Sequence, residues 1–116
     1  MVNYVKIDPD NCEYIAIVPD ADLPDGKRIF IEIDGVPIVV FRTGGEIYAI
    51  ADACSHDDGP LGDGDLDGYE VICPRHGARF DIRTGKVLAL PAVVDIPAYP
   101  VRVVDQLIEV GLPIGM

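Results

Sequence analysis

Residues 27–51 read KRIFIEIDGVPIVVFRTGGEIYAIA, and this stretch decides the fold. Its apolar segments are rich in β-branched and aromatic residues, which favours strands over helices. Asp34-Gly35 lies between the first two segments and is a strong hairpin signal. Thr43-Gly44-Gly45 provides a second turn. The stretch therefore predicts an antiparallel meander with strands at 27–33, 36–42 and 46–51.

Strand-like segments continue on both sides of this meander, and none of them has a helical period. The chain is also rich in turn formers, with 12 glycines and 10 prolines. Further strands are expected at 13–18, 69–72, 78–83, 86–90, 99–104 and 107–110. No helix of any length is expected. The predicted fold is an all-β antiparallel sandwich or barrel.

One long segment, residues 52–68, breaks the strand pattern. Five aspartates and four glycines lie between residues 57 and 68, without an apolar repeat. Loops of this length inside a compact domain are usually functional or disordered. We therefore predict a loop over 52–68, and a second irregular connection over 91–95.

Two short motifs bring metal-binding residue types to the ends of predicted strands. The first is Cys54-Ser55-His56, and the second is Cys73-Pro74-Arg75-His76. Sixteen residues separate the two motifs, which contain both histidines and two of the three cysteines of the chain. Thiolate and imidazole ligands suit iron–sulfur clusters and zinc.

These motifs and their surroundings resemble the Rieske signature. The agreement extends to Gly59-Pro60-Leu61, Gly77, Phe80-Asp81, Thr84-Gly85 and Leu90-Pro91-Ala92. It covers essentially the whole chain and is strongest with the small soluble Rieske ferredoxins. The resemblance implies a single domain over residues 1–116, in which a cluster-binding part at about 52–92 is inserted into a β base.

The resemblance also implies a [2Fe–2S] cluster and its ligands. Cys54 and Cys73 would bind one iron, and His56 and His76 would bind the other. Two neutral imidazoles in place of two thiolates raise the reduction potential to roughly −150 to +300 mV. The histidine side would lie nearest to solvent. The loops over the cluster would be shaped by Gly59, Pro60, Gly77 and Pro91.

Four positions differ from the respiratory and photosynthetic branch of that family. Gly59 and Arg75 stand where that branch has two further cysteines. Ala78 and Phe80 stand where it has a serine and a tyrosine hydroxyl against the cluster. Fewer hydrogen bonds to the cluster lower its potential. The chain is therefore expected in the low-potential ferredoxin branch.

Composition restricts the partners and the compartment. The formal net charge of −11 over 116 residues argues against nucleic acid and anionic membranes. No apolar run is long enough to span a membrane, and the first residues do not resemble a signal peptide. An odd number of cysteines argues against a disulfide framework, so Cys12 is expected to be a plain thiol. We expect a cytoplasmic monomer.

The chain is expected to be an electron carrier and not an enzyme. Both histidines are assigned to the cluster, and no glycine-rich nucleotide loop is present. The electron must then come from another protein. The resemblance implies an NAD(P)H-dependent flavoprotein reductase as donor and a terminal oxygenase, often one that hydroxylates aromatic compounds, as acceptor.

Three alternatives remain at this point. The chain could be the small Rieske subunit of a reductase such as NAD(P)H nitrite reductase. It could be a cluster-bearing helper or redox sensor, or a zinc-stabilised interaction module that uses the same four ligands.

The charged residues near the motifs also allow two interpretations. Asp57 and Asp58 could form an acidic docking rim, or simply a solvated loop. Arg75 and Arg79 are expected to pair with the acidic loop.

Overall fold

The computed structural model describes residues 7–57 and 59–114, and it confirms the all-β fold. In the part of the chain that is described, eleven strands form three antiparallel sheets, with two short 3₁₀ helices at Pro9–Asn11 and Asp20–Asp22. Within the described ranges, no helix is long and apolar enough to cross a membrane.

The three sheets are arranged as follows. Sheet A has the order β1 (Cys12–Pro19), β11 (Leu107–Pro113) and β10 (Val101–Val104). Sheet B has the order β2 (Arg28–Ile33), β3 (Val36–Thr43), β4 (Glu46–Ala51) and β9 (Ala98–Tyr99). Sheet C has the order β5 (Leu66–Asp67), β6 (Glu70–Ile72), β7 (Arg79–Asp81) and β8 (Val87–Ala89).

The predicted meander is β2–β3–β4. Ile33 pairs with Val36 across the first turn. Asp34 and Gly35 both take positive φ angles, 51° and 80°. This conformation matches the right-handed twist of the flanking strands, and an Asp-Gly pair adopts it at low cost. The turn chemistry therefore sets the register that the sequence predicts.

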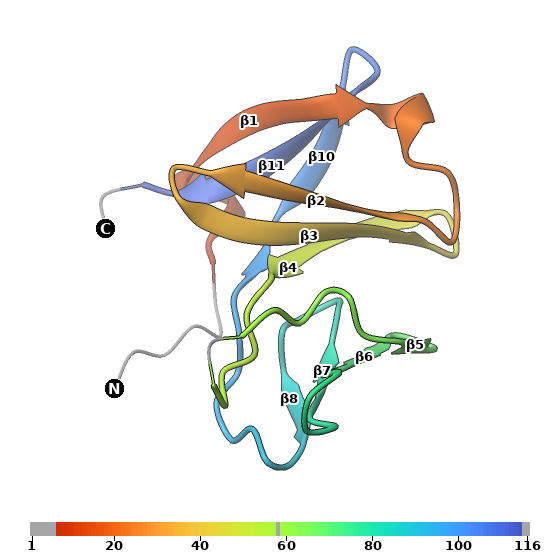
Figure 1. The fold of residues 1–116 in the computed structure, drawn as a ribbon. Helices are drawn as coiled ribbons and strands as arrows, with labels where there is room; N and C mark the ends of the chain where they lie inside the picture. The colour runs from red at the N-terminus through yellow and green to blue at the C-terminus, as the bar shows by residue number, and fades with distance from the viewer. Residues whose placement is uncertain (1–6, 58, 115–116) are drawn as a thin grey trace.

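Strand β3 is buried on both faces, which explains its uninterrupted apolar sequence. Ile38 and Val40 pack into one core, which also contains Ile108 from sheet A. Val39 and Phe41 point to the opposite face and into a second core. Sheet B is therefore the central layer of the molecule, between sheet A and the segment that carries sheet C (Figure 1).

Residues 52–97, which we call the small lobe, leave sheet B and return to it. The lobe follows β4 and precedes β9, and these two strands pair with each other through Ile50 and Ala98. Both ends of the lobe are thus held at the same edge of sheet B. Its core includes Leu61 and Phe80 and is continuous with the second core under β3. The ligand motifs lie on loops of this lobe.

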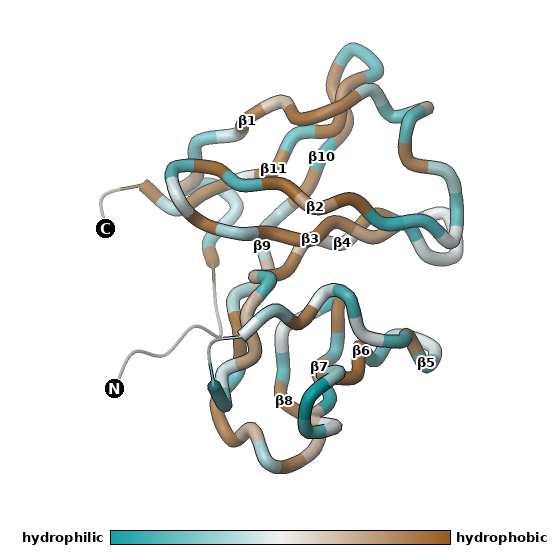
Figure 2. The backbone as a smooth tube through the Cα atoms, in the orientation of Figure 1, coloured by the Kyte–Doolittle hydropathy of each residue, from teal (hydrophilic) through white to brown (hydrophobic). Residues whose placement is uncertain are grey.

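Side chains of β2 and β3 contact the small lobe and hold it against sheet B. Arg28 donates hydrogen bonds to the carbonyl oxygens of Gly62 and Gly64, at 2.5 and 2.7 Å. Gly62 packs so closely on Val39 and Phe30 that a Cβ there would lie 2.7 and 2.9 Å from their side chains. Figure 2 shows hydrophobic stretches of β2 and β3 where the two parts meet.

Two strand predictions need correction. The segment 52–68 was expected to be a loop, but it contains β5, which pairs with β6 through Leu66 and Val71. A two-residue strand carries no period and is visible only once its partner is in place. The expected strand at 99–104 is divided at Pro100, because β9 belongs to sheet B and β10 to sheet A. Proline lacks the N–H that would continue a ladder.

Candidate metal centre

The first ligand loop follows β4 and is closed by its own backbone. The N–H of Cys54 donates to the carbonyl oxygen of Gly59 at 2.8 Å. Just before the loop, one carboxylate oxygen of Asp52 accepts hydrogen bonds from the N–H groups of Leu61 and Gly62, at 2.9 and 2.6 Å. Asp52 lies outside both ligand motifs. It anchors the far end of the loop against the end of β4.

The second ligand loop connects β6 to β7 and has a similar closure. The N–H of Cys73 donates to the carbonyl oxygen of Ala78 at 2.7 Å. The N–H of Gly77 donates to the carbonyl oxygen of Cys73 at 3.0 Å, and Gly77 has a φ of +79°. Glycine adopts this left-handed conformation without strain. In both loops the N–H of the cysteine donates a hydrogen bond to the carbonyl oxygen of the fifth residue after it. This hydrogen bond holds the intervening residues in a tight turn.

The two thiols lie together in the core of the small lobe. The exposed fractions of Cys54 and Cys73 are 0% and 1%, and both side chains are free thiols. Burial raises the pKa of the Cys54 thiol, and its neighbour Cys73 raises it further against an opposing backbone hydrogen bond at His56. A coordinated metal deprotonates such thiols.

The two imidazoles lie together at the surface. His56 and His76 are both exposed, and the side chain of His76 is 52% exposed. Their ring centroids are 5.2 Å apart, with the ring planes at 86°. The structure therefore brings all four predicted ligands together as a buried sulfur pair and an exposed nitrogen pair.

This arrangement fits a cluster with two irons better than a single zinc ion. Zinc would need all four ligands around one point. Within the described ranges, no three His, Cys, Asp or Glu side chains gather closely enough to hold one ion. Two separate pairs suit a [2Fe–2S] centre, in which thiolates hold one iron and imidazoles the other.

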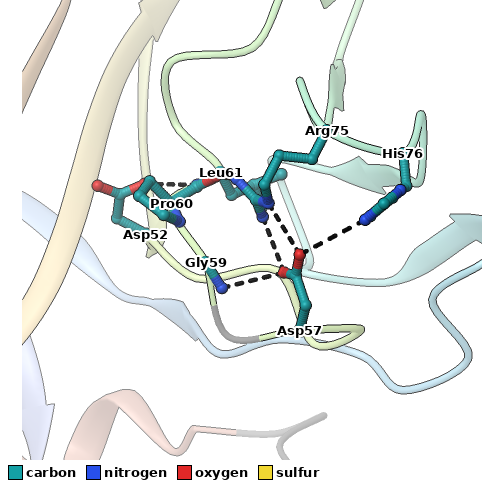
Figure 3. A network of polar contacts seen from close by, with 7 residues as sticks. All are labelled: Asp52, Asp57, Gly59, Pro60, Leu61, Arg75 and His76. Carbon is teal, nitrogen blue, oxygen red and sulfur yellow. Dashed lines mark hydrogen bonds and ion pairs between the residues drawn. The ribbon is translucent and has the colours of Figure 1, made fainter.

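A polar network connects the two ligand loops (Figure 3). The guanidinium of Arg75 binds both carboxylate oxygens of Asp57, at 2.8 and 2.9 Å. The hydrogen bonds from Arg75 hold the pKa of Asp57 well below its usual range. Arg75 also donates to the carbonyl oxygen of Pro60. The nearer oxygen of Asp57 lies 3.9 Å from Nε2 of His76, beyond hydrogen-bond distance.

A third loop, residues 90–95, lies against the first. The hydroxyl of Ser55 donates to the carbonyl oxygen of Val94. One carboxylate oxygen of Asp95 accepts from the N–H of Val87 at 2.9 Å, which holds the loop to β8. Leu90 and Val93 are 74% and 73% exposed. The loop therefore presents apolar side chains to solvent next to a polar anchor.

The other predicted residues are placed as follows. Arg75 and Arg79 both pair with the acidic loop, as expected, through Asp57 and Asp67 respectively. Arg79 also contacts Glu70 of β6 at 3.3 Å. Asp58 lies outside the described residues. Cys12 lies on β1 in sheet A, half-buried, with Sγ 3.3 Å from the carbonyl oxygen of Asp8. Cys12 therefore belongs to a different sheet from the ligand loops.

Sequence reasoning missed the residues that support the loops: Arg28, Asp52 and Ser55. Asp52 directly precedes the ligand loop, and a carboxylate at a strand end is a recognisable sign of an anchored turn. For Arg28 no local signal exists, because its carbonyl partners lie 34 and 36 residues further along the chain.

A comparison with known proteins gives a family match over most of the chain. Residues 13–100 match the family described as Rieske [2Fe-2S] domain. The 3-phenylpropionate/cinnamic acid dioxygenase ferredoxin subunit of Escherichia coli (strain K12) is 44% identical over 96 residues. That alignment covers 82% of this chain and 90% of the relative.

Solved structures give the same result. The ferredoxin of carbazole 1,9a-dioxygenase from Nocardioides aromaticivorans IC177 superposes with a TM-score of 0.78 at 35% identity, covering 84% of this chain and 95% of that one. A chain from the complex of reduced oxygenase and oxidized ferredoxin in carbazole 1,9a-dioxygenase gives 0.78 at 29% identity, covering 84% and 92%.

Proposed function

Because the chain belongs to the Rieske [2Fe–2S] domain family, we propose that it is a ferredoxin that carries one electron from a flavoprotein reductase to a terminal oxygenase. The observation that carries this proposal is the pairing of two buried thiols with two exposed imidazoles on adjacent loops. Family membership assigns a [2Fe–2S] cluster to the chain. When bound, such a cluster accepts and returns a single electron.

We assign the ligands of this cluster to Cys54, Cys73, His56 and His76. The thiolates would be held in a water-excluded core beside Ala78 and Phe80. The imidazoles would face solvent, and the exposed position of both rings gives a partner protein direct access to that side. The backbone closure of each loop keeps the ligands oriented before the metal binds, which reduces the cost of binding.

The names of the relatives support a proposal about the partners. One is named as the ferredoxin subunit of a dioxygenase, and another was solved in a complex with its oxygenase. We propose a terminal oxygenase as electron acceptor, and an NAD(P)H-dependent flavoprotein reductase as donor. Repeated transfer between two partners requires docking that is weak and fast, which favours a small exposed contact around the histidines.

The proposal also covers the domain organisation, the oligomeric state and the compartment of the protein. We propose a single Rieske domain, because the core under β3 combines Val39 and Ile50 of sheet B with Leu61 and Phe80 of the small lobe. We propose a monomer in a reducing compartment such as the cytoplasm, where the thiols of Cys54 and Cys73 stay available for iron.

The decisive experiment is electron paramagnetic resonance of the protein after dithionite reduction, with iron and zinc analysis of the same sample. We expect about two irons per chain and a rhombic signal whose average g lies well below that of an all-cysteine centre. A silent sample with about one zinc per chain would overturn the proposal in favour of a zinc-stabilised interaction module.

The ligand assignment has its own test. His56→Cys and His76→Cys variants that still hold a cluster should have a lower reduction potential, because a thiolate adds negative charge. Arg79→Gln, which alters a nearby ion pair and no ligand, is the control. Unchanged potentials in loaded cysteine variants would contradict the assignment.

A further inference from the structure

We propose that Arg75, Asp57 and Gly59 form a clamp that locks the two ligand loops together and sets how firmly the chain retains its cluster. The inference rests on the ligand assignment made above and adds a positioning role for residues that bind no metal themselves. Asp57 directly follows His56, and Arg75 directly precedes His76. A bond between Asp57 and Arg75 therefore joins the two turns at the residues next to the two histidines.

The contacts of the clamp run from one loop to the other. Among the residues that the structure describes, the backbone hydrogen bonds from Cys54 to Gly59 and from Cys73 to Ala78 each close one loop on itself. The Arg75 guanidinium instead makes a two-pronged contact with Asp57 and a third bond to the carbonyl oxygen of Pro60 in the first loop. Only a planar guanidinium can satisfy this fork, because its donors lie in fixed directions.

Gly59 completes the clamp by leaving room for it. A Cβ at Gly59 would lie 2.7 Å from the central guanidinium carbon of Arg75 and 2.8 and 2.9 Å from two of its nitrogens. The guanidinium thus packs directly against the glycine backbone. The N–H of Gly59 also donates to Asp57 at 3.0 Å, which orients the carboxylate toward Arg75.

An isolated surface ion pair contributes little to stability, and this one is about 30% exposed on both sides. Three features distinguish it from such a pair. Its contact is bidentate, one of its acceptors is a backbone carbonyl, and its carboxylate is already oriented by a backbone N–H. We therefore expect this ion pair to fix the relative position of the two loops, and to change the free energy of unfolding only weakly.

The test is the half-time of cluster loss, followed by visible absorbance of the loaded protein. Arg75→Gln and Asp57→Asn should each shorten the half-time about fivefold, the rate equivalent of a strong exposed ion pair. Arg75→Lys should behave like Arg75→Gln, because lysine keeps the charge and loses the fork. The resonance lines of the reduced Arg75→Gln protein should broaden, because loosened loops hold the histidines in a wider range of orientations.

Gly59→Ala gives a test that removes neither charge. The added methyl should push the guanidinium away and shorten the half-time in the wild-type background. It should have no further effect in the Arg75→Gln background, since contacts that act as a unit are not additive. The matched control is Arg79→Gln, which breaks the ion pairs with Asp67 and Glu70 inside sheet C and should leave the half-time unchanged.

Several outcomes would overturn the clamp. These are a wild-type half-time in Arg75→Gln, full rescue by Arg75→Lys, additive losses in the Gly59→Ala/Arg75→Gln double variant, or an equal loss in Arg79→Gln. If Arg75→Gln does not load a cluster, a wild-type half-time in Gly59→Ala decides against the clamp. Failure of the proposed function is separate, because it would appear as wild-type protein without cluster iron.

Discussion

Ala78 and Phe80 lie beside the cysteines in the same buried core, and neither side chain carries a hydrogen-bond donor. The backbone of Ala78 closes the second ligand loop. Two side chains next to the proposed sulfur ligands are thus apolar. Since hydrogen bonds to sulfur raise the potential of a cluster, this surrounding favours a low value.

Adding a hydroxyl at either position should therefore raise the reduction potential. Ala78→Ser and Phe80→Tyr are each expected to shift it upward by about 60 mV. This is the one-electron equivalent of about 1.4 kcal/mol, the scale of one hydrogen bond to a charged group. Protein-film voltammetry of the loaded variants measures the shift, and Phe80→Leu serves as an apolar control. A downward shift in both hydroxyl variants would contradict this explanation.

Asp81 at the end of β7 predicts a pH dependence of stability. Burial raises its pKa, but hydrogen bonds from the Arg83 side chain and backbone outweigh burial, so the pKa lies below its ordinary value. A carboxylate with a depressed pKa stabilises the folded state above its unfolded pKa. That stability is lost as the pH falls through the folded pKa.

The stability difference between wild type and Asp81→Asn should thus be largest near neutral pH and shrink in acid. In the wild-type protein the N–H of Arg83 donates to a carboxylate oxygen of Asp81 at 2.8 Å. Asparagine keeps an oxygen that can accept this hydrogen bond, so the substitution mainly removes the charge. Urea unfolding at a series of pH values measures the difference. A difference that grows as the pH falls below 4 would contradict the sign.

Among the elements, β2 contacts the small lobe through one charged side chain. The Arg28 guanidinium lies 5.0 Å from the Phe41 ring centroid and also reaches the carbonyl oxygens of Gly62 and Gly64. Both carbonyls belong to the segment that follows the first ligand loop. The orientation of that loop therefore depends on a side chain in a different sheet.

Arg28→Met should destabilise the protein by about 1–3 kcal/mol, because two partly buried carbonyl oxygens lose their charged donor. Methionine keeps much of the apolar contact with Phe41. Chemical denaturation measures the change. Lys27→Met, which removes an exposed cation one position earlier, should stay within about 0.5 kcal/mol of wild type. Equal losses of stability in the two variants would show that the missing positive charge, and not the hydrogen bonds of Arg28, causes the effect.

The charge distribution concerns the whole molecule. Five arginines are each engaged with a carboxylate: Arg42, Arg75, Arg79, Arg83 and Arg102. The formal net charge of −11 shows that acidic groups outnumber basic ones in the chain, which surrounds the molecule with a negative field. Such a field speeds encounter with a positively charged partner surface.

Reduction of the protein by the proposed flavoprotein reductase should therefore slow with added salt. Raising NaCl from about 0.05 to 0.5 M shortens the Debye length from about 14 to 4 Å and should lower the second-order rate about tenfold. Stopped-flow mixing measures this rate. Dithionite is itself an anion, so its reduction of the same protein should not slow with salt, which serves as the control for effects on the cluster itself. A flat dependence would remove the steering role of the acidic surface.

Features encoded in neighbouring residues could be predicted from the sequence. The meander at 27–51 follows from apolar segments rich in β-branched and aromatic residues and from the Asp34-Gly35 turn, whose backbone conformation and hydrogen bonding are local. The order and spacing of Cys54, His56, Cys73 and His76 identify the family, because the ligand types specify the chemistry they can support. The pairing of Arg79 with acidic residues was also predictable from the density of aspartates.

Only the tertiary structure decided which distant segments meet. The sequence predicts that Arg75 pairs with the acidic loop, but only the fold selects Asp57 as its partner. The fold also brings Arg28 to Gly62 and Ser55 to Val94, so that these three contacts join residues 18, 34 and 39 positions apart. The path of the chain between them is set by the packing of both faces of sheet B and leaves no periodic trace in the sequence. The sequence by itself predicted most of the strands, the turns and the proposed ligand set. The fold alone determined the supports that hold those ligands together, because contacts between remote segments exist only after the cores have formed.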